Sequence, residues 1–293
     1  MGFPFSKYHA LGNDYLVIHE RDLRSPLSPE IIRRICDRNY GVGSDGIVLI
    51  APQTPNGFPV RIYNPDGSEA EISGNGMRIA ARYLFDCGLV DSSPFNLLAG
   101  GSRIVRSEVL GAEGAAIRVE MGQATFLSSR IPVLGNERLV LKEQLMIDGE
   151  VLTYSCVNVG NPHCVIFMDG STNRHELKSL ALKFGPRIEA HKSFPNRTNV
   201  QFASIVSDNC VDIEIWERGA GYTLASGSSS CAVAAVGHKL GLLAEQVTVK
   251  MPGGELSIVI HQDDCVTLEG PVHAVYTGKL SPSFDSRCPF TYR

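Results

Sequence analysis

The chain has 293 residues, with 27 Lys and Arg against 31 Asp and Glu, which gives a net charge of −4. This length predicts two domains of about 130 to 150 residues each. The charge leaves no basic footprint for a nucleic acid, and no apolar run reaches the length needed to span a membrane. The 43% hydrophobic and 20% charged composition is typical of a globular α/β or α+β protein.

Eight cysteines are scattered along the chain without the CxxC spacing or the histidine cluster of a zinc site. We therefore expect no metal. No signal peptide opens the chain, so we expect a cytoplasmic protein whose thiols are reduced.

In chain order, the sequence alternates many short strands with few helices. Helix patterns occupy residues 29–39, 76–88, 175–191 and 230–241. Strand patterns bounded by turn residues occupy 12–18, 60–64, 115–122, 155–160, 164–169, 199–206, 211–217, 247–254, 256–262 and 265–270. This pattern predicts an α+β fold rich in strands.

The two halves of the chain repeat each other. The segment "IYNPDGSEAEISGNGMRIAA" from Ile62 aligns without a gap with "IWERGAGYTLASGSSSCAVA" from Ile215, and Ser73 then falls on Ser226. "GNDYLVI" at 12–18 resembles "GNPHCVI" at 160–166. We therefore expect two pseudo-symmetric β-rich domains. The first covers residues 1–125 and is completed by 273–293, and the second covers 126–272.

Each copy of the repeat places a Ser-Gly step between a strand and an Ala-rich stretch that reads as an amphipathic helix. The first N–H groups and the positive dipole end of a helix favour a carboxylate or an oxyanion. Two such helix starts facing each other would form an anion-binding cleft between the domains. The alternative for each turn taken alone is an ordinary serine cap.

Six segments resemble the successive signatures of the diaminopimelate epimerases, in the same order and over nearly the whole length. They are "FSKYHALGNDYLVI", "DRNYGVGSDGIVLI", "IYNPDGSEAEISGNGMR", "VGNPHCVIF", "FPNRTNVQF" and "ERGAGYTLASGSSSCA". The resemblance implies two mirrored domains, each a small sheet wrapped around a central helix, with the substrate in the cleft between them. It also implies inversion at the α-carbon of an amino acid without a cofactor.

The resemblance further implies the site residues. Amides that would grip the polar ends of the substrate are Asn13, Asn64, Asn161 and Asn199. The two anion-binding helix starts would be formed by Gly74, Asn75, Gly227 and Ser228. Glu217 and Arg218 would receive the α-amino and carboxyl groups, and His163 and Glu217 would lie beside the acid and base. Turn chemistry is the alternative for each asparagine, and a buried core role is the alternative for His163.

At four positions, two of them catalytic in the family, the chain departs from the pattern that the resemblance implies. The family has a catalytic cysteine in each Ser-Gly step, where this chain has Ser73 and Ser226. A thiol titrates near ~8.5 and an alcohol is closer to water at about 15.7, so forming the base costs about 9 to 10 kcal/mol more. The chain also has Gly46 where the family has glutamine, and Tyr222 where it has glutamate. Cys231 lies further along the predicted helix, where a packing role suffices.

Three hypotheses follow. The first is an amino-acid epimerase that moves protons through His163, Glu217 or Asp66, with the serines as hydrogen-bonding neighbours. The second is a dehydratase or double-bond isomerase on a related carboxylate, which needs one base only. The third is an inactive homologue that binds an amino acid. In each case the partner is a small molecule, with neither nucleic acid nor membrane involved, and a homodimer is an assembly that the sequence allows.

Overall fold

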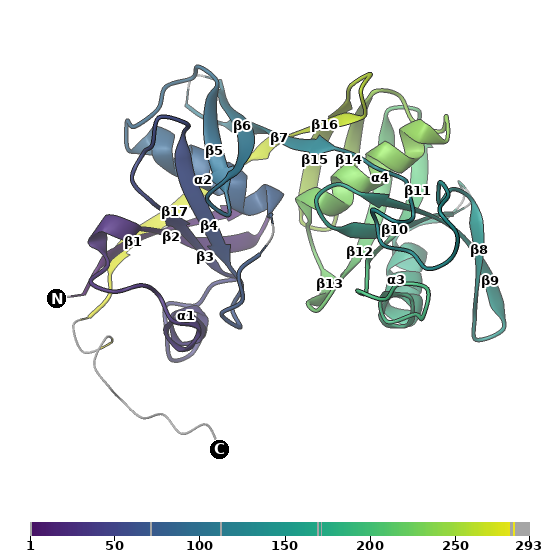
Figure 1. Cartoon of the computed structure of the whole chain (residues 1–293), viewed down its shortest axis with the longest axis horizontal. Coiled ribbons are helices and arrows are strands. Elements are labelled where there is room, and N and C mark those ends of the chain that lie inside the picture. The colour runs from purple at the N-terminus through teal and green to yellow at the C-terminus, as the bar shows by residue number, and fades with distance from the viewer. Residues whose placement is uncertain are drawn as a thin grey trace. The chain divides into compact units, whose positions relative to one another are not determined.

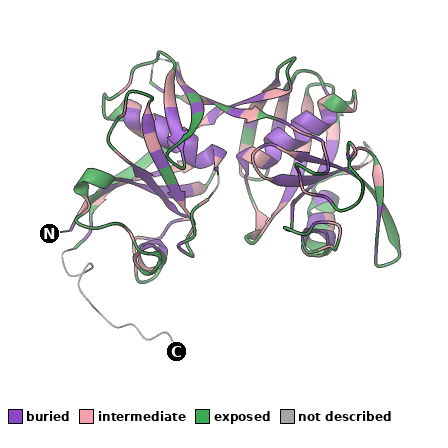
Figure 2. Ribbon diagram, in the orientation of Figure 1, coloured by how far each residue is buried: buried purple, intermediate pink, exposed green. Residues whose placement is uncertain are grey.

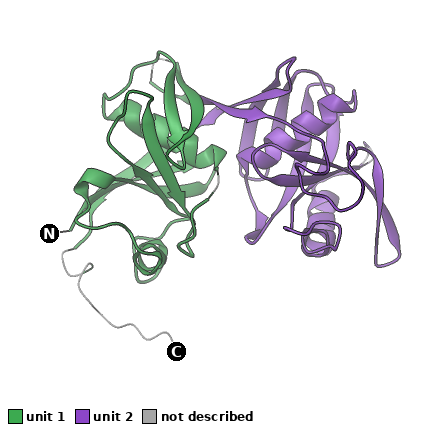
Figure 3. Ribbon diagram, in the orientation of Figure 1, with its two compact units in different colours: residues 1–117, 272–293 green, residues 118–271 purple. Residues whose placement is uncertain are grey.

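The computed structural model describes residues 2–281, except 71, 112, 169 and 171, together with residue 284. The chain divides into two compact units, residues 1–117 with 272–293 and residues 118–271 (Figure 3). The first unit ends at Ile117, before the division near residue 125 that the sequence suggested. The boundary falls within strand β7 (Ala116–Gln123), which pairs with β16 (Cys265–Pro271) of the second unit.

The first unit is a mixed sheet with one helix packed on its strands and a shorter helix nearby (Figure 1). Its elements are β1 (Pro4–Ala10), β2 (Asn13–His19), η1 (Glu20–Asp22), α1 (Pro29–Cys36), β3 (Ile47–Ile50), β4 (Phe58–Tyr63), α2 (Gly74–Asp86), β5 (Phe95–Ala99), β6 (Arg103–Leu110) and β17 (His273–Lys279). The strands pair in the order β17, β1, β2, β3, β4, β5, β6. The C-terminal strand β17 therefore joins the first unit through β1.

The second unit repeats this plan. Besides β7 and β16, its elements are β8 (Glu143–Ile147), β9 (Glu150–Asn158), β10 (Pro162–Met168), α3 (Arg174–Glu189), β11 (Asn199–Ser207), β12 (Cys210–Glu217), β13 (Gly221–Thr223), α4 (Gly227–Lys239), β14 (Gln246–Met251) and β15 (Gly254–Ile260). From β9 through β10, β11, β12 and β14 to β15, the pairs are antiparallel, parallel, antiparallel, parallel and antiparallel. The run from β1 to β6 has the same succession. The internal repeat of the sequence is thus a repeat of topology.

Helices α2 and α4 are the central helices of their units. Helix α2 packs against strands β1 to β6, and α4 packs against β9, β10, β11, β14, β15 and β16. Both are buried along most of their length (Figure 2). The sequence suggested an amphipathic stretch here, but strands cover α4 on nearly every side. In α2, a small residue permits close packing, because a Cβ added at Gly76 would come within 2.5 Å of the Ile62 side chain.

Cores of aliphatic and aromatic side chains hold the outer helices. Ile32 and Ile35 of α1 are fully buried in the first unit, and Phe184 of α3 is fully buried against Phe202 in the second. In the part of the chain that the structure describes, no helix is long and apolar enough to cross a membrane. The seven described cysteines are free thiols, and Cys288 lies outside the described residues.

Candidate functional site

Each central helix begins directly after its serine, in nearly the same geometry. Ser73 has φ −133° and ψ 116°, and its hydroxyl accepts a hydrogen bond from the Gly76 N–H at 3.1 Å. Ser226 has φ −148° and ψ 123°, and its hydroxyl accepts from the Ser229 N–H at 3.4 Å. An N-cap serine binds one of the first N–H groups of a helix, and the others point out of its end. Each unit therefore offers one positively polarised helix start.

Both serine hydroxyls have the contacts of helix caps. Ser73 is half-buried and Ser226 is buried. The Ser226 hydroxyl also lies 3.5 Å from the Ser228 hydroxyl, while the Ser226 carbonyl accepts from the Ser230 hydroxyl at 2.9 Å. Among the described residues, neither capping hydroxyl has a hydrogen bond to a carboxylate or an imidazole.

Asn13 and Asn75 meet at the start of α2. The Asn75 amide donates to the Asn13 side-chain oxygen at 2.9 Å, and the Asn13 amide donates to the Asp45 carboxylate at 3.0 Å. The fully buried Arg78 guanidinium donates to the Asn75 side-chain oxygen at 2.9 Å and to the Gly74 carbonyl at 3.3 Å. Sequence reasoning missed Arg78, although an arginine within an Ala-rich buried helix is a signal that could have found it.

Behind Asn13 lies a cluster of opposite charges. The Asp14 carboxylate pairs with Lys7 and with Arg38, both at 2.7 Å, and Arg38 also pairs with Asp45 at 2.7 Å. Burial alone would raise the pKa of Asp14, but hydrogen bonds from Arg38 and Lys7 bring that pKa below its usual range. Asp14 therefore supports the start of β2 as an ion-pair partner.

Asn64 and Asp66 belong to a turn after β4. The Asn64 amide donates to the Ser68 hydroxyl at 3.0 Å, and the Asp66 carboxylate accepts from the Ser68 N–H at 2.8 Å and from its hydroxyl at 2.6 Å. These hydrogen bonds hold the pKa of the exposed Asp66 below its usual range. For Asp66 the turn role is sufficient.

In the second unit, Asn161, His163, Asn199 and Arg218 lie in one connected group. His163 Nε2 is 2.7 Å from the Asn161 side-chain oxygen, and His163 lies opposite Asn199 in the parallel pair β10 and β11. The Asn199 amide donates to the Pro162 carbonyl at 2.8 Å, and its oxygen accepts from the Arg218 N–H at 2.9 Å. Glu217 is the last residue of β12 and, like Arg218, is half-buried.

His163 is fully buried, and burial lowers its pKa from 6.5 to about 3, with the positive charge of Arg218 acting in the same direction. Its imidazole is therefore neutral at physiological pH. A neutral imidazole next to Asn161 can accept or donate one hydrogen bond, and its low pKa makes it a weak base.

The lowered pKa predicts a pH dependence of stability. The folded state binds fewer protons than the unfolded state between about pH 3 and 6.5, so stability falls as the pH falls through this window. His163→Gln keeps an amide near Asn161 but removes this titration. Between pH 7.5 and pH 5, we expect the free energy of unfolding of the unmodified chain to fall by about 2 kcal/mol more than that of the variant. Urea denaturation of both proteins at the two pH values measures the difference, and equal falls would contradict it.

Gly46 and Tyr222, which also depart from the family pattern, each fit their surroundings in the structure. A Cβ at Gly46 would lie 2.4 Å from the Tyr63 carbonyl and 2.7 Å from the Tyr15 ring, so a side chain does not fit there. The Tyr222 hydroxyl donates to the buried Glu214 carboxylate at 2.7 Å. Burial raises the pKa of Glu214. Cys231 is fully buried in α4, as a packing role requires.

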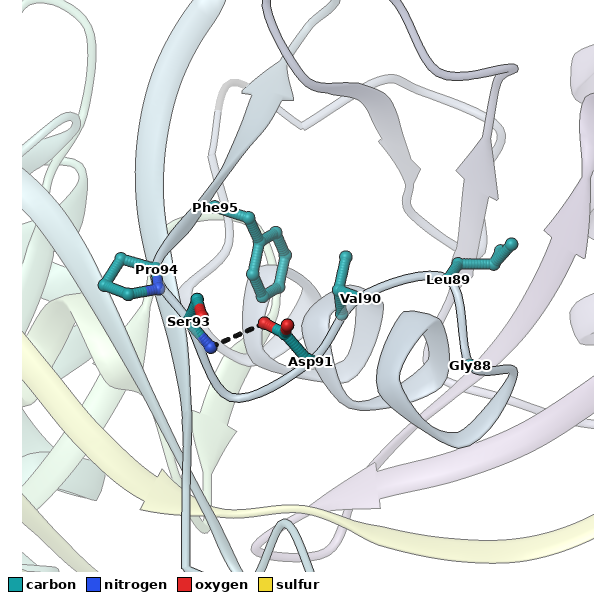
Figure 4. A pocket seen from close by; sticks show the side chains of 7 residues that line it. All are labelled: Gly88, Leu89, Val90, Asp91, Ser93, Pro94 and Phe95. Carbon is teal, nitrogen blue, oxygen red and sulfur yellow. Dashed lines mark hydrogen bonds between the residues drawn. The ribbon is translucent and has the colours of Figure 1, made fainter.

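A hollow of about 420 Å³ follows the end of α2 in the first unit (Figure 4). It is lined by Gly88, Leu89, Val90, Asp91, Ser93, Pro94 and Phe95. None of the predicted site residues is among them. Within the described ranges, no group of three or more His, Cys, Asp or Glu side chains is placed to hold a metal ion.

Comparison with known proteins agrees with the repeated topology. The profile of the diaminopimelate epimerase family matches residues 5–127 and 155–278. The chain is 51% identical over 279 residues to diaminopimelate epimerase 2 of Nostoc sp., covering 94% of this chain and 95% of that protein. It is 37% identical over 290 residues to diaminopimelate epimerase 1 of the same organism, covering 96% and 100%.

Among solved structures, a hydroxyproline epimerase from Agrobacterium vitis with bound trans-4-hydroxy-L-proline has a TM-score of 0.71 at 12% identity, covering 96% of this chain and 94% of that one. This likeness shows a shared fold. The relatives that are 51% and 37% identical place the protein in the class of amino-acid epimerases. Within that class, the chain belongs to the diaminopimelate epimerase family.

Proposed function

We propose that the protein inverts the α-carbon of diaminopimelate, or of a closely related amino acid, without a cofactor. The observation that carries this proposal is the matched pair of capped helix starts at Ser73 and Ser226. Each can offer main-chain N–H groups to a carboxylate, and the α-carboxylate at the reacting end of diaminopimelate is the group on which charge develops during inversion. The 51% identity to a protein named diaminopimelate epimerase supports this substrate.

The chemistry requires a base to remove the α-proton and an acid to return one from the opposite face. We assign the helix-start N–H groups of Gly74, Asn75, Gly227 and Ser228 to the α-carboxylate, where they stabilise the charge that develops as the proton leaves. Asn13, Asn64, Asn161 and Asn199 would bind the remaining polar groups.

We assign Glu217 to one of the two proton transfers. It adjoins Arg218, whose N–H is bound by Asn199, whereas His163 is a weak base and Asp66 is held in a turn. The side chain of Arg218 would bind the α-carboxylate, next to the α-carbon at which the proton is transferred. Ser73 and Ser226 would donate hydrogen bonds to the reacting centre. The names of the relatives do not favour the second hypothesis, a dehydratase or double-bond isomerase. They do not favour the third, an inactive homologue that binds an amino acid, either.

The proposal is tested by proton exchange in D₂O. Purified protein is incubated separately with the LL, DD and meso isomers of diaminopimelate, with lysine and proline as comparison substrates. We expect deuterium at the α-carbon of diaminopimelate together with interconversion of its isomers, followed by mass spectrometry and chiral chromatography. Lysine lacks the second amino-acid end and should exchange more slowly. Absence of α-deuterium in every diaminopimelate isomer would refute the proposal, and exchange into proline alone would assign a different substrate.

We further place the enzyme in the cytoplasm, which the seven free thiols of the described chain support.

A further inference from the structure

A buried carboxylate outside the predicted site holds the segment that carries Glu217 and Arg218. Glu189 is the last residue of α3 and is only 4% exposed. One of its oxygens accepts from the Trp216 indole N–H at 2.8 Å, and the other accepts from the Gly219 main-chain N–H at 2.7 Å. The two donors belong to the residues directly before and after the Glu217–Arg218 pair.

The charge of Glu189 is matched by its surroundings. Arg197 lies 3.0 Å from the same oxygen that binds Gly219. A buried carboxylate is costly unless donors satisfy it, and here a guanidinium, an indole and a main-chain amide do so. With all three donors in place, the directions of both oxygens are fixed. The carboxylate therefore holds the loop of residues 216–219 in place.

The loop has three anchoring points within four residues. Glu189 binds Trp216 and Gly219, and the Asn199 side chain binds the main-chain N–H of Arg218 between them. Close packing adds to this restraint, because a Cβ added at Gly185 of α3 would lie 2.6 Å from the Trp216 side chain. Gly219 has φ +81°, a left-handed conformation that glycine adopts without strain and that turns the chain after Arg218.

From this geometry we infer that Glu189 is a positioning residue that sets the direction of Glu217 and Arg218 towards the substrate. The inference rests on the proposed function, in which Glu217 transfers a proton at the α-carbon and Arg218 binds the α-carboxylate. Glu189 acts through the loop and has no contact with substrate in this role. A carboxylate is required because its two oxygens accept from two N–H groups, whereas an amide presents one oxygen and one N–H group.

The test compares Glu189→Gln with a matched control, Glu143→Gln. Glu143 belongs to the same unit and accepts from Arg138 at 2.6 and 2.8 Å and from the Tyr154 hydroxyl at 2.9 Å. We expect Glu189→Gln to raise KM about tenfold, because Arg218 binds the substrate carboxylate, and to lower kcat about tenfold, because Glu217 is no longer directed at the α-carbon. Glu143→Gln should leave KM unchanged, even if its melting temperature falls.

A second measurement needs no substrate. Hydrogen exchange of the peptide covering residues 216–221 should become at least tenfold faster in Glu189→Gln and remain unchanged in Glu143→Gln. Trp216 is the only tryptophan of the chain, so a change in the emission spectrum reports directly on its bond to Glu189. If no variant or parent shows epimerase activity, the proposed function fails, while exchange and fluorescence still decide whether Glu189 holds the loop.

Unchanged KM together with unchanged exchange in Glu189→Gln would overturn the inference. If that variant does not fold, Trp216→Phe removes one of the two N–H donors and retains an aromatic ring. We then expect a KM increase of about threefold and faster exchange at Gly219, and values equal to those of the parent protein would overturn the inference in the same way.

Discussion

The double variant Ser73→Cys, Ser226→Cys should exchange and invert the α-proton of diaminopimelate at least about 10³-fold faster than the parent protein. The two serines cap equivalent helices, and the family resemblance places a catalytic thiol at each position. A thiolate costs about 9 to 10 kcal/mol less to form than an alkoxide. Recovery of half of that difference, about 5 kcal/mol, corresponds to a factor of 10³ to 10⁴ in rate.

Deuterium incorporation measured on the parent, the two single variants and the double variant tests this expectation. Ser228→Cys is the matched control, because it puts a thiol in the first turn of α4 but one position past the first helical residue. Its gain should be less than tenfold, and each single variant should fall short of the double variant. A double variant that folds and binds diaminopimelate but exchanges no faster than the parent would show that the capping positions are not the reacting positions.

Glu217→Gln should lower kcat of the parent protein by about 10² to 10⁴, the range in which a positioned acid or base acts. The substitution keeps the shape of the side chain and removes its charge and its ability to take up a proton. KM should change little, because in the proposed mechanism the substrate carboxylate is bound by Arg218 and by the helix-start N–H groups, which the substitution leaves in place.

The control for this prediction is Glu214→Gln. Glu214 lies on the same strand, β12, and accepts from Tyr222, so its loss tests the stability of the strand without touching the Glu217–Arg218 pair. Steady-state kinetics of both variants at several pH values provide the comparison. If kcat of Glu217→Gln is within threefold of the parent value, the proton must move through a different group.

Local patterns were enough to predict much of the fold. The positions of Ser73 and Ser226 at helix starts follow from a serine before an Ala-rich stretch, and the structure confirms both caps. The match between the two halves of the sequence predicted duplicated β-rich units, and the order of antiparallel and parallel pairs confirms the duplication. What the pattern did not predict was that α4 is covered on nearly every side, because burial depends on strands that are distant in the sequence.

The supporting residues of the site were harder to predict for the same reason. Glu189 ends a helix with a charged exposed face, and the sequence alone gives it the character of a surface residue. Its burial arises only when Trp216, Gly219 and Arg197 bring their donors to it. Asn13 and Asn75 were expected on the basis of family resemblance, and the structure adds that they bind each other and that Arg78 fixes their orientation.

The serine caps also show how a chain of this fold can exchange reactivity at a helix start for an ordinary cap without losing its fold. A hydroxyl at the N-cap is among the preferred ways to begin a helix, while a thiol is a weak hydrogen-bond acceptor. Replacing a reactive thiol by serine at either helix start would therefore cost reactivity but not thermal stability. The main-chain N–H groups would keep their affinity for carboxylates throughout. In such a scaffold, ligand recognition is inherited with the backbone, whereas reactivity depends on one atom at each helix start and is free to vary.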